Sequence, residues 1–382
     1  MSPETPFEIA IVGGGITGLG LAWELAERGR RVVVFEADRV GRGATWAAAG
    51  MLAPSVEIGF EELDLYALGR ESLARWPAFA RRLEAASGAD VGYRDDPTLV
   101  VADDRDSTAA LRRLFAFQRE HGVPVEWLSG DEAREVEPLL SPRLPAAIFS
   151  PTDHQVDHRA VVQALLVAAR GAGAEVHEHT AVSHVELDAE APAVVIADGS
   201  RVAARVVVVA AGVWSAGLDG LDPAPPVRGV KGQALALRLD PERGLDPHHV
   251  VRGPDAYLVP KADGRLVVGA TSEDGVADSR VTAGGLYRLL EGAVEIMPAV
   301  EEMELVETWV GHRPASRDHA PLLGRSPHPG VVYATGHYRH GVLLAPVTAE
   351  EVGAEVERML AGSPETAPIL GPFSPLRFST LP

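Results

Sequence analysis

A glycine-rich loop between two apolar segments constrains the possible fold of this chain more than any other feature. Phe7–Val12 reads FEIAIV, a run typical of a buried parallel strand, and GGGITG follows at once, from residue 13 to residue 18. Apolar residues at helical spacing continue to Gly29, and residues 31–35 (RVVVF) predict a second strand that ends at Glu36. This order of segments predicts a βαβ unit that binds a dinucleotide.

The residue types in this loop suit a pyrophosphate. Gly13 permits a tight turn, Gly15 lets the phosphates approach the backbone, and Gly18 lets the helix pack closely on the strand. The helix N-terminus adds amide donors and the positive end of its dipole. Glu36 can accept hydrogen bonds from both ribose hydroxyls and would repel a 2′-phosphate, which disfavours NADP. The loop by itself leaves FAD and NAD open.

Three later segments favour FAD. Residues 41–54 (GRGATWAAAGMLAP) are small enough to let a flat ring system approach the backbone. Residues 205–215 (RVVVVAAGVWS) predict a buried strand that breaks at Gly212. Residues 331–348 (VVYATGHYRHGVLLAPVT) predict a strand, a glycine turn and a helix. A terminal βα unit that returns to the cofactor suits a large two-ring dinucleotide, whereas a nicotinamide enzyme does not need one.

These segments, together with GHRP at 311–314, resemble the glycine oxidase branch of the D-amino-acid oxidase family. The similarity runs from Ile9 to the last predicted helix near Leu360, and its most specific parts are ATWAAAGMLAP and GHYRHGVLLAP. It implies an α/β fold in which a doubly wound, Rossmann-like FAD-binding domain is interleaved with a substrate domain built on an antiparallel sheet. We expect the FAD-binding domain to comprise residues 1–90, 146–225 and 315–382, and the substrate-binding domain to comprise residues 91–145 and 226–314.

The resemblance also implies which residues contact FAD. They are Gly13, Gly15, Ile16, Thr17, Gly18, Glu36, Ala37, Ala44, Thr45, Ala49, Gly50, Met51, Val182, Gly212, His337, Tyr338, Arg339, His340, Gly341, Val342 and Leu343. The helix expected to start near Gly341 would point its N-terminus toward the flavin C2 carbonyl. We expect non-covalent binding, because the chain has no cysteine for a thioether and no histidine before His121 in the N-terminal glycine-rich segments.

The expected catalytic residues are few, because a flavin that oxidises an amino acid needs the substrate to be positioned more than it needs acid–base groups. The planar fork of arginine holds a carboxylate through two parallel hydrogen bonds. The resemblance places Arg313, in GHRP, at the substrate carboxylate, and Tyr257 as the donor of a further hydrogen bond to it. It places Arg339 beside both flavin and substrate.

The activity expected from the resemblance is FAD-dependent oxidative deamination of glycine or another small amino acid to an imine or oxo acid, ammonia and hydrogen peroxide. The imine would feed thiamine biosynthesis. Two alternatives stay open: an oxidase of D-amino acids, sarcosine or other N-alkyl glycines, and a dehydrogenase that passes electrons to an acceptor other than oxygen. Three positions depart from the family pattern, namely Asp255 in place of histidine, Ser272 in place of methionine and His340 in place of asparagine. The first two are pocket positions, so they leave the substrate range open.

Other patterns predict the remaining elements. Helices are expected over residues 61–86, 107–121, 131–139 (capped by Asp131), 157–171 and 286–295. Strands are expected over residues 91–104 (around a turn), 174–179, 233–239, 249–260, 265–269 and 303–310. The proline-rich tail, residues 361–382, is expected to follow the surface or to be partly disordered.

Charge and composition exclude several partners. The formal net charge of −19 disfavours nucleic acid and anionic lipid, and no apolar run is long enough for a membrane span. The polar, acidic start does not resemble a secretory signal, so we expect a soluble cytoplasmic protein. The histidines and aspartates of DHQVDH, residues 153–158, are interpreted as a helix start rather than a metal site, and no metal is expected. By resemblance the protein is expected to be a homo-oligomer, namely a tetramer.

Overall fold

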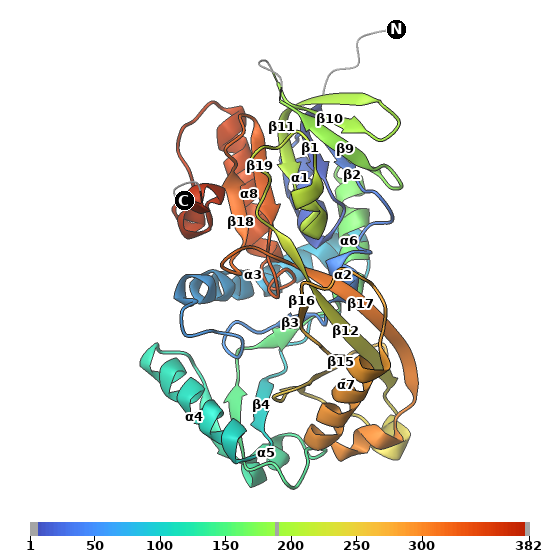
Figure 1. The fold of residues 1–382 in the computed structure, drawn as a ribbon, viewed down its shortest axis with the longest axis vertical. Helices are drawn as coiled ribbons and strands as arrows, with labels where there is room; N and C mark the ends of the chain where they lie inside the picture. Colours follow the sequence, from blue (N-terminus) through green and yellow to red (C-terminus); the bar gives the residue numbers. More distant parts are fainter. Residues whose placement is uncertain (1–6, 188–190, 379–382) are drawn as a thin grey trace.

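The computed structural model describes residues 7–187 and 191–378. These contain two large sheets, which lie one above the other in Figure 1, and one small two-stranded sheet. The upper sheet contains β1 (Phe7–Val12), β2 (Val32–Phe35), β11 (Arg201–Val209) and β19 (Val331–Thr335). The lower sheet contains β12 (Arg228–Arg238), β15 (Arg265–Gly269) and β17 (Leu305–Ala315). The expected α/β class, with parallel and antiparallel sheets in one chain, is confirmed.

The upper sheet has the order expected of a dinucleotide-binding fold. Its strands run β18 (Leu322–Arg325), β19, β11, β1, β2 and β8 (Glu175–His177). All neighbouring pairs are parallel except β18 with β19. The central strands are continuous apolar runs because both of their faces are covered. A hairpin, β9 (Val182–Glu186) and β10 (Ala193–Ile196), continues from the start of β11.

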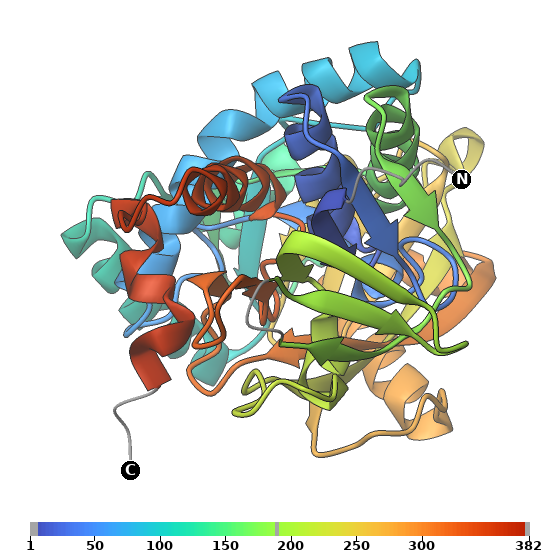
Figure 2. The same ribbon diagram turned by 90° about the horizontal axis from the view of Figure 1, so that it is seen from above.

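Alternate residues of β1 enter two different cores. Ile9 and Ile11 pack on the side covered by α1 (Ile16–Glu27), α6 (His158–Gly171) and α8 (Ala345–Leu360). Ala10 and Val12 pack on the side covered by the β9–β10 hairpin and by the 3₁₀ turn η1 (Gly212–Gly217). Figure 2 shows this hairpin on one side of the sheet. Because successive side chains of a strand point to opposite faces, one set of β1 side chains packs under the helices and the other packs under the hairpin.

The lower sheet contains nine strands, most of them antiparallel. Their order is β16 (Glu273–Asp274), β12, β15, β14 (Tyr257–Pro260), β13 (Val250–Arg252), β4 (Thr98–Ala102), β6 (Ala146–Ser150) and β5 (Glu126–Ser129), with β17 also paired to β12. Only β13 and β4 are parallel neighbours among the pairs described in this sheet. Helix α7 (Ala283–Ile296) covers one face and completes a separate core.

The remaining elements connect the two sheets or border them. They are α2 (Ala44–Ala47), β3 (Met51–Leu52), α3 (Leu63–Ser87), α4 (Arg105–Glu120), α5 (Gly130–Val136), β7 (His154–Gln155), and the 3₁₀ turns η2 (Pro241–Arg243), η3 (Pro298–Glu302), η4 (Pro368–Phe373) and η5 (Pro375–Phe378). Strands β3 and β7 pair with each other in a small sheet.

Three local expectations from the sequence need correction. Residues 249–260 form two strands instead of one, because Gly253 and Pro254 interrupt the ladder and the Gly253 amide donates to the Ala256 carbonyl at 2.8 Å. Residues 91–104 contain only one strand of the main sheets, β4. Helix α5 is capped by Ser129 and not by Asp131: Ser129 and Glu132 bond each other's backbone amides in a capping box.

Strand pairing also bears on the domain boundaries. Strand β6 pairs with β4 and β5, so residues 146–150 belong to the lower sheet although we assigned them to the FAD-binding part. The segment crosses to the upper sheet only after Ser150, through β7 and α6. The rest of the division stays a proposal, with this crossing moved from residue 146 to residue 151.

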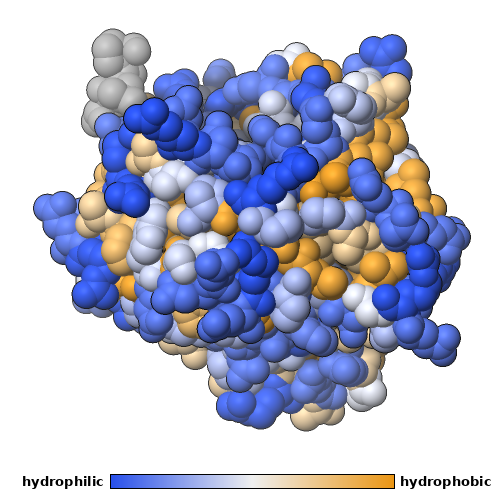
Figure 3. Space-filling view, turned by 90° about the horizontal axis from the view of Figure 1, so that it is seen from below, coloured by the Kyte–Doolittle hydropathy of each residue, from blue (hydrophilic) through white to orange (hydrophobic). Residues whose placement is uncertain are grey.

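The C-terminal segment follows the surface in the two 3₁₀ turns η4 and η5, and Leu370 and Phe373 are buried against the helices of the upper half. The expectations for residues 1–6 and 379–382 lie outside the described residues. Within residues 7–187 and 191–378, no helix is both long and apolar enough to cross a lipid bilayer. On the lower face, hydrophilic residues cover most of the surface and hydrophobic ones gather mainly on one side (Figure 3).

Candidate active site

A cavity of about 1010 Å³ lies at the junction of the two sheets. At one end it is lined by Glu36, Ala37 and Val182 of the upper half, and at the other by Tyr257 and Arg313 of the lower half. The glycine loop, the segment around α2 and the turn before α8 line the part between these ends. A long cavity that joins a βαβ loop to a sheet of a second unit suits an extended dinucleotide and a small co-substrate.

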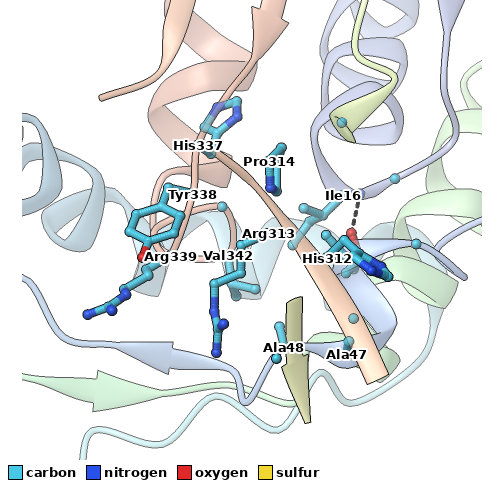
Figure 4. A pocket seen from close by; sticks show the side chains of 18 of the residues that line it. Ile16, Ala47, Ala48, His312, Arg313, Pro314, His337, Tyr338, Arg339 and Val342 are labelled. Carbon is cyan, nitrogen blue, oxygen red and sulfur yellow. Dashed lines mark hydrogen bonds between the residues drawn. The ribbon is translucent and has the colours of Figure 1, made fainter. Parts of the chain in front are cut away.

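The glycine loop is shaped by close backbone contacts. Gly13 has φ +107°, and a Cβ there would lie 2.6 Å from the Ala210 carbonyl oxygen. A Cβ on Gly18 would overlap the Gly13 carbonyl, so α1 packs directly on the loop as the sequence predicts. The Ile16 amide donates to Thr45 Oγ1 at 3.1 Å, the dashed line in Figure 4. This bond ties the first turn of α1 to α2.

Glu36 follows β2 and lines the cavity. Its Oε2 accepts from the Gly14 amide at 2.7 Å and its Oε1 accepts from the Asp38 amide at 3.0 Å. Both bonds fix the carboxylate beside the glycine loop. The sequence predicts this proximity from the βαβ spacing.

The small-residue segment packs directly on β17. A Cβ on Gly311 would overlap Ala47, and Trp309 Nε1 donates to the Ala47 carbonyl at 3.2 Å. Gly50 has φ +78° and a Cβ there would overlap the Val156 carbonyl, so glycine is required. Through these contacts, residues 44–51 are packed between β17 and the segment that leads into α6.

Arg313 and Tyr257 lie on neighbouring parts of the lower sheet, each across a glycine. A Cβ on Gly232 of β12 would lie 2.6 Å from Arg313 Nη1, and a Cβ on Gly269 of β15 would overlap the Tyr257 hydroxyl. Arg313 Nη1 donates to the Thr271 carbonyl at 3.1 Å. Burial raises the pKa of Tyr257 although the charge of Arg313 opposes this, so the phenol keeps its proton and can donate.

The turn between β19 and α8 brings Arg339 into the same cavity. Tyr338 has φ +51°, its amide donates to the Pro314 carbonyl at 2.8 Å, and its ring stacks on His319 with 4.5 Å between ring centroids. The Arg339 guanidinium lies 5.1 Å from the Tyr338 ring centroid. In Figure 4 the side chains of Arg313 and Arg339 extend toward the same side, whereas His312 points to the opposite side of β17.

Two histidines in this turn are buried. His337 Nε2 lies 3.1 Å from Thr348 Oγ1, and burial, with a smaller contribution from His340, lowers the pKa of His337 to about 4. Burial also lowers the pKa of His340, although Glu57 opposes it. Both rings are therefore neutral at pH 7.

Helix α8 begins later than the sequence suggested. Residues 341–344 form turns, in which the Leu344 amide donates to the His340 carbonyl at 2.8 Å, and the regular helix starts at Ala345. Pro346 in the first turn explains this start, since proline has no amide to donate and suits the first helical positions.

The structure gathers most of the predicted site residues around the one cavity. Three do not line it, namely Gly18, His340 and Leu343. Gly18 serves the close packing of α1, and His340 Nδ1 faces Glu57 Oε2 at 3.7 Å. Leu343 is in the core, and its carbonyl accepts from Ser72 and Trp76. The roles of all these residues toward cofactor and substrate remain predictions.

Sequence reasoning missed several residues that line the cavity. They are Glu57, Trp214, Arg252, Thr271, Arg288 and His312. Arg252 Nη1 donates to the Val56 carbonyl at 3.1 Å and lies 3.4 Å from Glu57 Oε1, which brings an ion pair to the substrate end. His312 adjoins Arg313 inside GHRP, so the motif itself could have indicated it. No local pattern marks Arg252, because its position depends on pairing between distant strands.

The residues of DHQVDH have other roles than metal binding. Asp153 accepts from the amides of Ser55 and Val56, Asp157 caps α6, and His158 Nε2 lies 3.2 Å from the Trp46 carbonyl oxygen. In the described part of the chain, no group of three or more histidine, aspartate or glutamate side chains is arranged to hold a metal ion.

Comparisons with known proteins agree with this geometry. The family model described as FAD dependent oxidoreductase (DAO) matches residues 8–355. A glycine oxidase of Geobacillus kaustophilus is 38% identical over 96% of this chain and 96% of its own length. The bifunctional protein ThiO/ThiG of a Synechocystis strain is 34% identical over 99% of this chain, which spans 55% of that relative.

A solved structure is similar over the whole chain. The crystal structure of glycine oxidase from Geobacillus kaustophilus has a TM-score of 0.89 and 37% sequence identity, and the match covers 97% of this chain and 99% of that one. The family match over most of the chain, together with this relative, settles the assignment suggested by the glycine loop and by GHRP. The chain belongs to the DAO family of FAD-dependent oxidoreductases.

Proposed function

We propose that the protein is an FAD-dependent oxidase of glycine or another small amino acid. One observation supports the proposal most: Arg313 and Tyr257, which could hold a carboxylate together, line the same cavity as the glycine loop. The names of the similar proteins, glycine oxidase above all, agree with this substrate class. They do not favour the alternatives of a D-amino-acid or N-alkyl-glycine oxidase or a dehydrogenase.

The cavity fits FAD in shape and in chemistry. Gly13, Gly15 and the first turn of α1 would hold the pyrophosphate through backbone amides. Glu36 would accept from the ribose hydroxyls, and Val182 would lie at the adenine. Residues 44–51 and the turn 337–342 would hold the ring system. This proposal keeps the cofactor non-covalent.

The substrate end of the cavity suits the carboxylate of an amino acid. Arg313 presents a guanidinium whose orientation is fixed at one nitrogen by the Thr271 carbonyl, and Tyr257 keeps a proton to donate. Together they would hold the substrate carboxylate by charge-assisted hydrogen bonds. With the carboxylate fixed there, the Cα–H would be directed at the flavin, and Arg339 would border the same space.

Bound FAD supplies the two-electron acceptor for the Cα–H hydride. The protein supplies the orientation of the carboxylate and, in the turn before α8, the neutral rings of His337 and His340. The substrate would react with its amine neutral, because the nitrogen lone pair forms the C=N bond as the Cα–H electron pair leaves. This step requires no covalent bond between the substrate and a side chain of the protein. The glycine product would be an imine, which hydrolyses to glyoxylate and ammonia.

The test is anaerobic bleaching of the flavin by a panel of glycine, sarcosine, D-alanine, D-proline and L-proline. The proposal expects glycine to bleach it fastest, whereas fastest bleaching by D-alanine, D-proline or sarcosine would favour the alternative oxidases. Re-oxidation in air with stoichiometric hydrogen peroxide would support an oxidase. Re-oxidation only by an added dye would contradict the oxidase and favour the dehydrogenase.

Two further expectations belong to the proposal. A homotetramer is expected by resemblance, and size-exclusion chromatography with light scattering would measure it. The similarity to a ThiO/ThiG protein suggests that the imine is consumed in thiamine biosynthesis. Restored growth of a glycine-oxidase-deficient thiamine auxotroph would support that assignment.

A further inference from the structure

Lys231 is a buried charge that the proposed reaction does not use. It lies on β12 with 1% of its side chain exposed. Its Nζ donates to Asp278 Oδ1 at 2.9 Å and lies 3.7 Å from Glu273 Oε2. An ammonium at this depth needs charged partners, and both partners lie between β15 and α7.

A continuous chain of contacts runs from Lys231 to Arg313. Glu273 Oε1 accepts from Thr271 Oγ1 at 2.6 Å and from Gln233 Nε2 at 2.7 Å. Thr271 Oγ1 in turn accepts a hydrogen bond from the backbone amide of Gln233 at 2.9 Å. The Thr271 carbonyl accepts from Arg313 Nη1 at 3.1 Å. Each of these contacts therefore limits the movement of the next residue between Lys231 and Arg313.

The same residues attach the whole segment 270–282 to β12. Gln233 Oε1 accepts from the Thr282 amide at 2.7 Å, and Thr282 Oγ1 caps α7 by accepting from the Gly285 amide at 3.1 Å. Burial opposes ionisation of Glu273, but the hydrogen bonds from Thr271 and Gln233 and the charge of Lys231 hold its pKa below the usual value. The carboxylate therefore stays charged and keeps its bonds.

We propose that Lys231 is a positioning residue for the substrate carboxylate. It holds Glu273 in place, Glu273 holds Thr271, and the Thr271 carbonyl sets the direction of the Arg313 fork. This inference rests on the proposed function, in which Arg313 binds the carboxylate. Two-pronged binding depends on the plane of the guanidinium, so a loosened carbonyl lowers affinity for carboxylates before it affects the chemical step.

The experiment uses the FAD-loaded enzyme with Lys231→Met, which keeps the unbranched side chain up to the position of Cε and removes the charged group. Acetate, a carboxylate without an amine, is titrated through the change it causes in the flavin absorption spectrum. We expect the acetate dissociation constant and the KM for glycine to rise roughly tenfold. The limiting rate of anaerobic flavin reduction should change less than threefold, and FAD affinity less than twofold.

Three companion variants separate positioning from general damage. Lys231→Arg should recover part of the acetate affinity. Thr271→Val removes the hydroxyl that joins Thr271 to Glu273, while Lys231 keeps its charge pairs. This variant should weaken acetate binding in the same way. It also replaces Lys231→Met as the test if that variant does not fold. Arg280→Met removes the exposed partner of Asp278, which lies 3.0 Å away, and should leave acetate binding within twofold.

Two results would overturn the inference. Acetate affinity within twofold of the native enzyme in both Lys231→Met and Thr271→Val would mean that the chain of contacts does not reach Arg313. A parallel loss of FAD affinity, limiting rate and acetate affinity would mean a structural role only. Arg313→Met separates these results from the proposed function: unchanged acetate affinity in that variant would refute Arg313 as the anchor, whatever Lys231 does.

Discussion

Arg313 and Tyr257 each extend across a glycine of the adjacent strand, and this arrangement decides what can reach them. Gly232 and Gly269 leave the space that the guanidinium and the phenol occupy. A larger residue at either position would push the side chain into the cavity. The substrate end of the cavity therefore requires glycine at positions 232 and 269 as much as it requires Arg313 and Tyr257.

The first prediction at this scale concerns Arg313. Arg313→Ala would leave a bound carboxylate without its charged partner in a buried site, a loss of about 2–5 kcal/mol. The kcat/KM for glycine should then fall by roughly thirty- to several-thousandfold, whereas FAD content should not change. Arg313→Lys should recover only part, since an ammonium lacks the fork. Activity on glycine within a few-fold of native would place the anchor elsewhere, with Arg339 next.

Glu36 allows a second prediction. Glu36→Arg would remove the ribose acceptor and the bonds that the carboxylate receives from the Gly14 and Asp38 amides. Charge-assisted hydrogen bonds contribute about 1.5–3 kcal/mol, so FAD should bind roughly ten- to hundredfold more weakly. Titration of the apoprotein with FAD, followed by flavin fluorescence, measures this. An unaltered dissociation constant would show that Glu36 does not contact the ribose.

At the scale of elements, the sequence predicted what depends on local pattern. The strands of the βαβ unit, helix α1 and the N-cap of α6 follow from apolar runs, glycine stops and Asp157. The capping box at Ser129 was missed because Asp131 offered an equally good local alternative as the N-cap. The break at Gly253 was missed although Gly253 followed by Pro254 is a local signal for a turn. The Arg252–Glu57 pair could not be predicted, since it depends on which distant segments pack together.

The contact between α2 and β17 gives a third prediction. Gly311→Ala would place a Cβ against Ala47 and push residues 44–51 out of the cavity wall. Overpacking of this kind amounts to about 1–3 kcal/mol, so FAD affinity should fall roughly tenfold. Gly284→Ala in α7 is the matched control, because its Cβ would meet nothing within 4 Å, and it should leave FAD affinity unchanged. Equal affinities in the two variants would contradict this account.

The segment after β3 gives a pH-dependent prediction through Asp153. Burial raises the pKa of Asp153 to about 7, although the amides of Val56 and Ser55 oppose the shift. The native state therefore holds this proton over a range, from about pH 4 to pH 7, in which the unfolded state has lost it. The contribution of Asp153 to the free energy of unfolding is thus complete below pH 4 and is lost as the pH rises through 7.

Asp153→Asn should remove this dependence. The stability of the native protein relative to the variant should fall by roughly 2–3 kcal/mol between pH 5 and pH 8. Urea unfolding of both proteins at these two pH values gives the difference, and other titrating groups cancel in it. Parallel pH profiles would mean that Asp153 is ionised throughout.

At the scale of the whole molecule, the two sheets share one cavity and the chain passes between them several times. Strand β17 contacts both halves of the molecule, because it pairs with β12 along the lower sheet and also packs against α2 of the upper half. The segment around α2, which borders the proposed cofactor site, therefore packs on the strand that carries Arg313 of the proposed substrate site. This favours a fixed distance between the two sites over closure by rotation of one part against the other.

A prediction at this scale concerns how FAD is retained. The chain has no cysteine, and its N-terminal glycine-rich segments have no histidine before His121, so we expect FAD to be retained by non-covalent contacts. Acid precipitation should release all the yellow colour into the supernatant. Colour that stays with the pellet after washing would show a covalent bond and would contradict the proposed mode of binding.

The strand order of the upper sheet also bears on synthesis at the ribosome. Strand β1 emerges first, yet Ile9 pairs with Val206 on one side, and Val207 beyond it pairs with Val331. Translation adds about 5–20 residues per second, so β11 and β19 emerge on the order of ten seconds or more after the glycine loop. The residues that line the cavity extend along the chain to Val342, so the complete cavity can form only after translation has passed that residue.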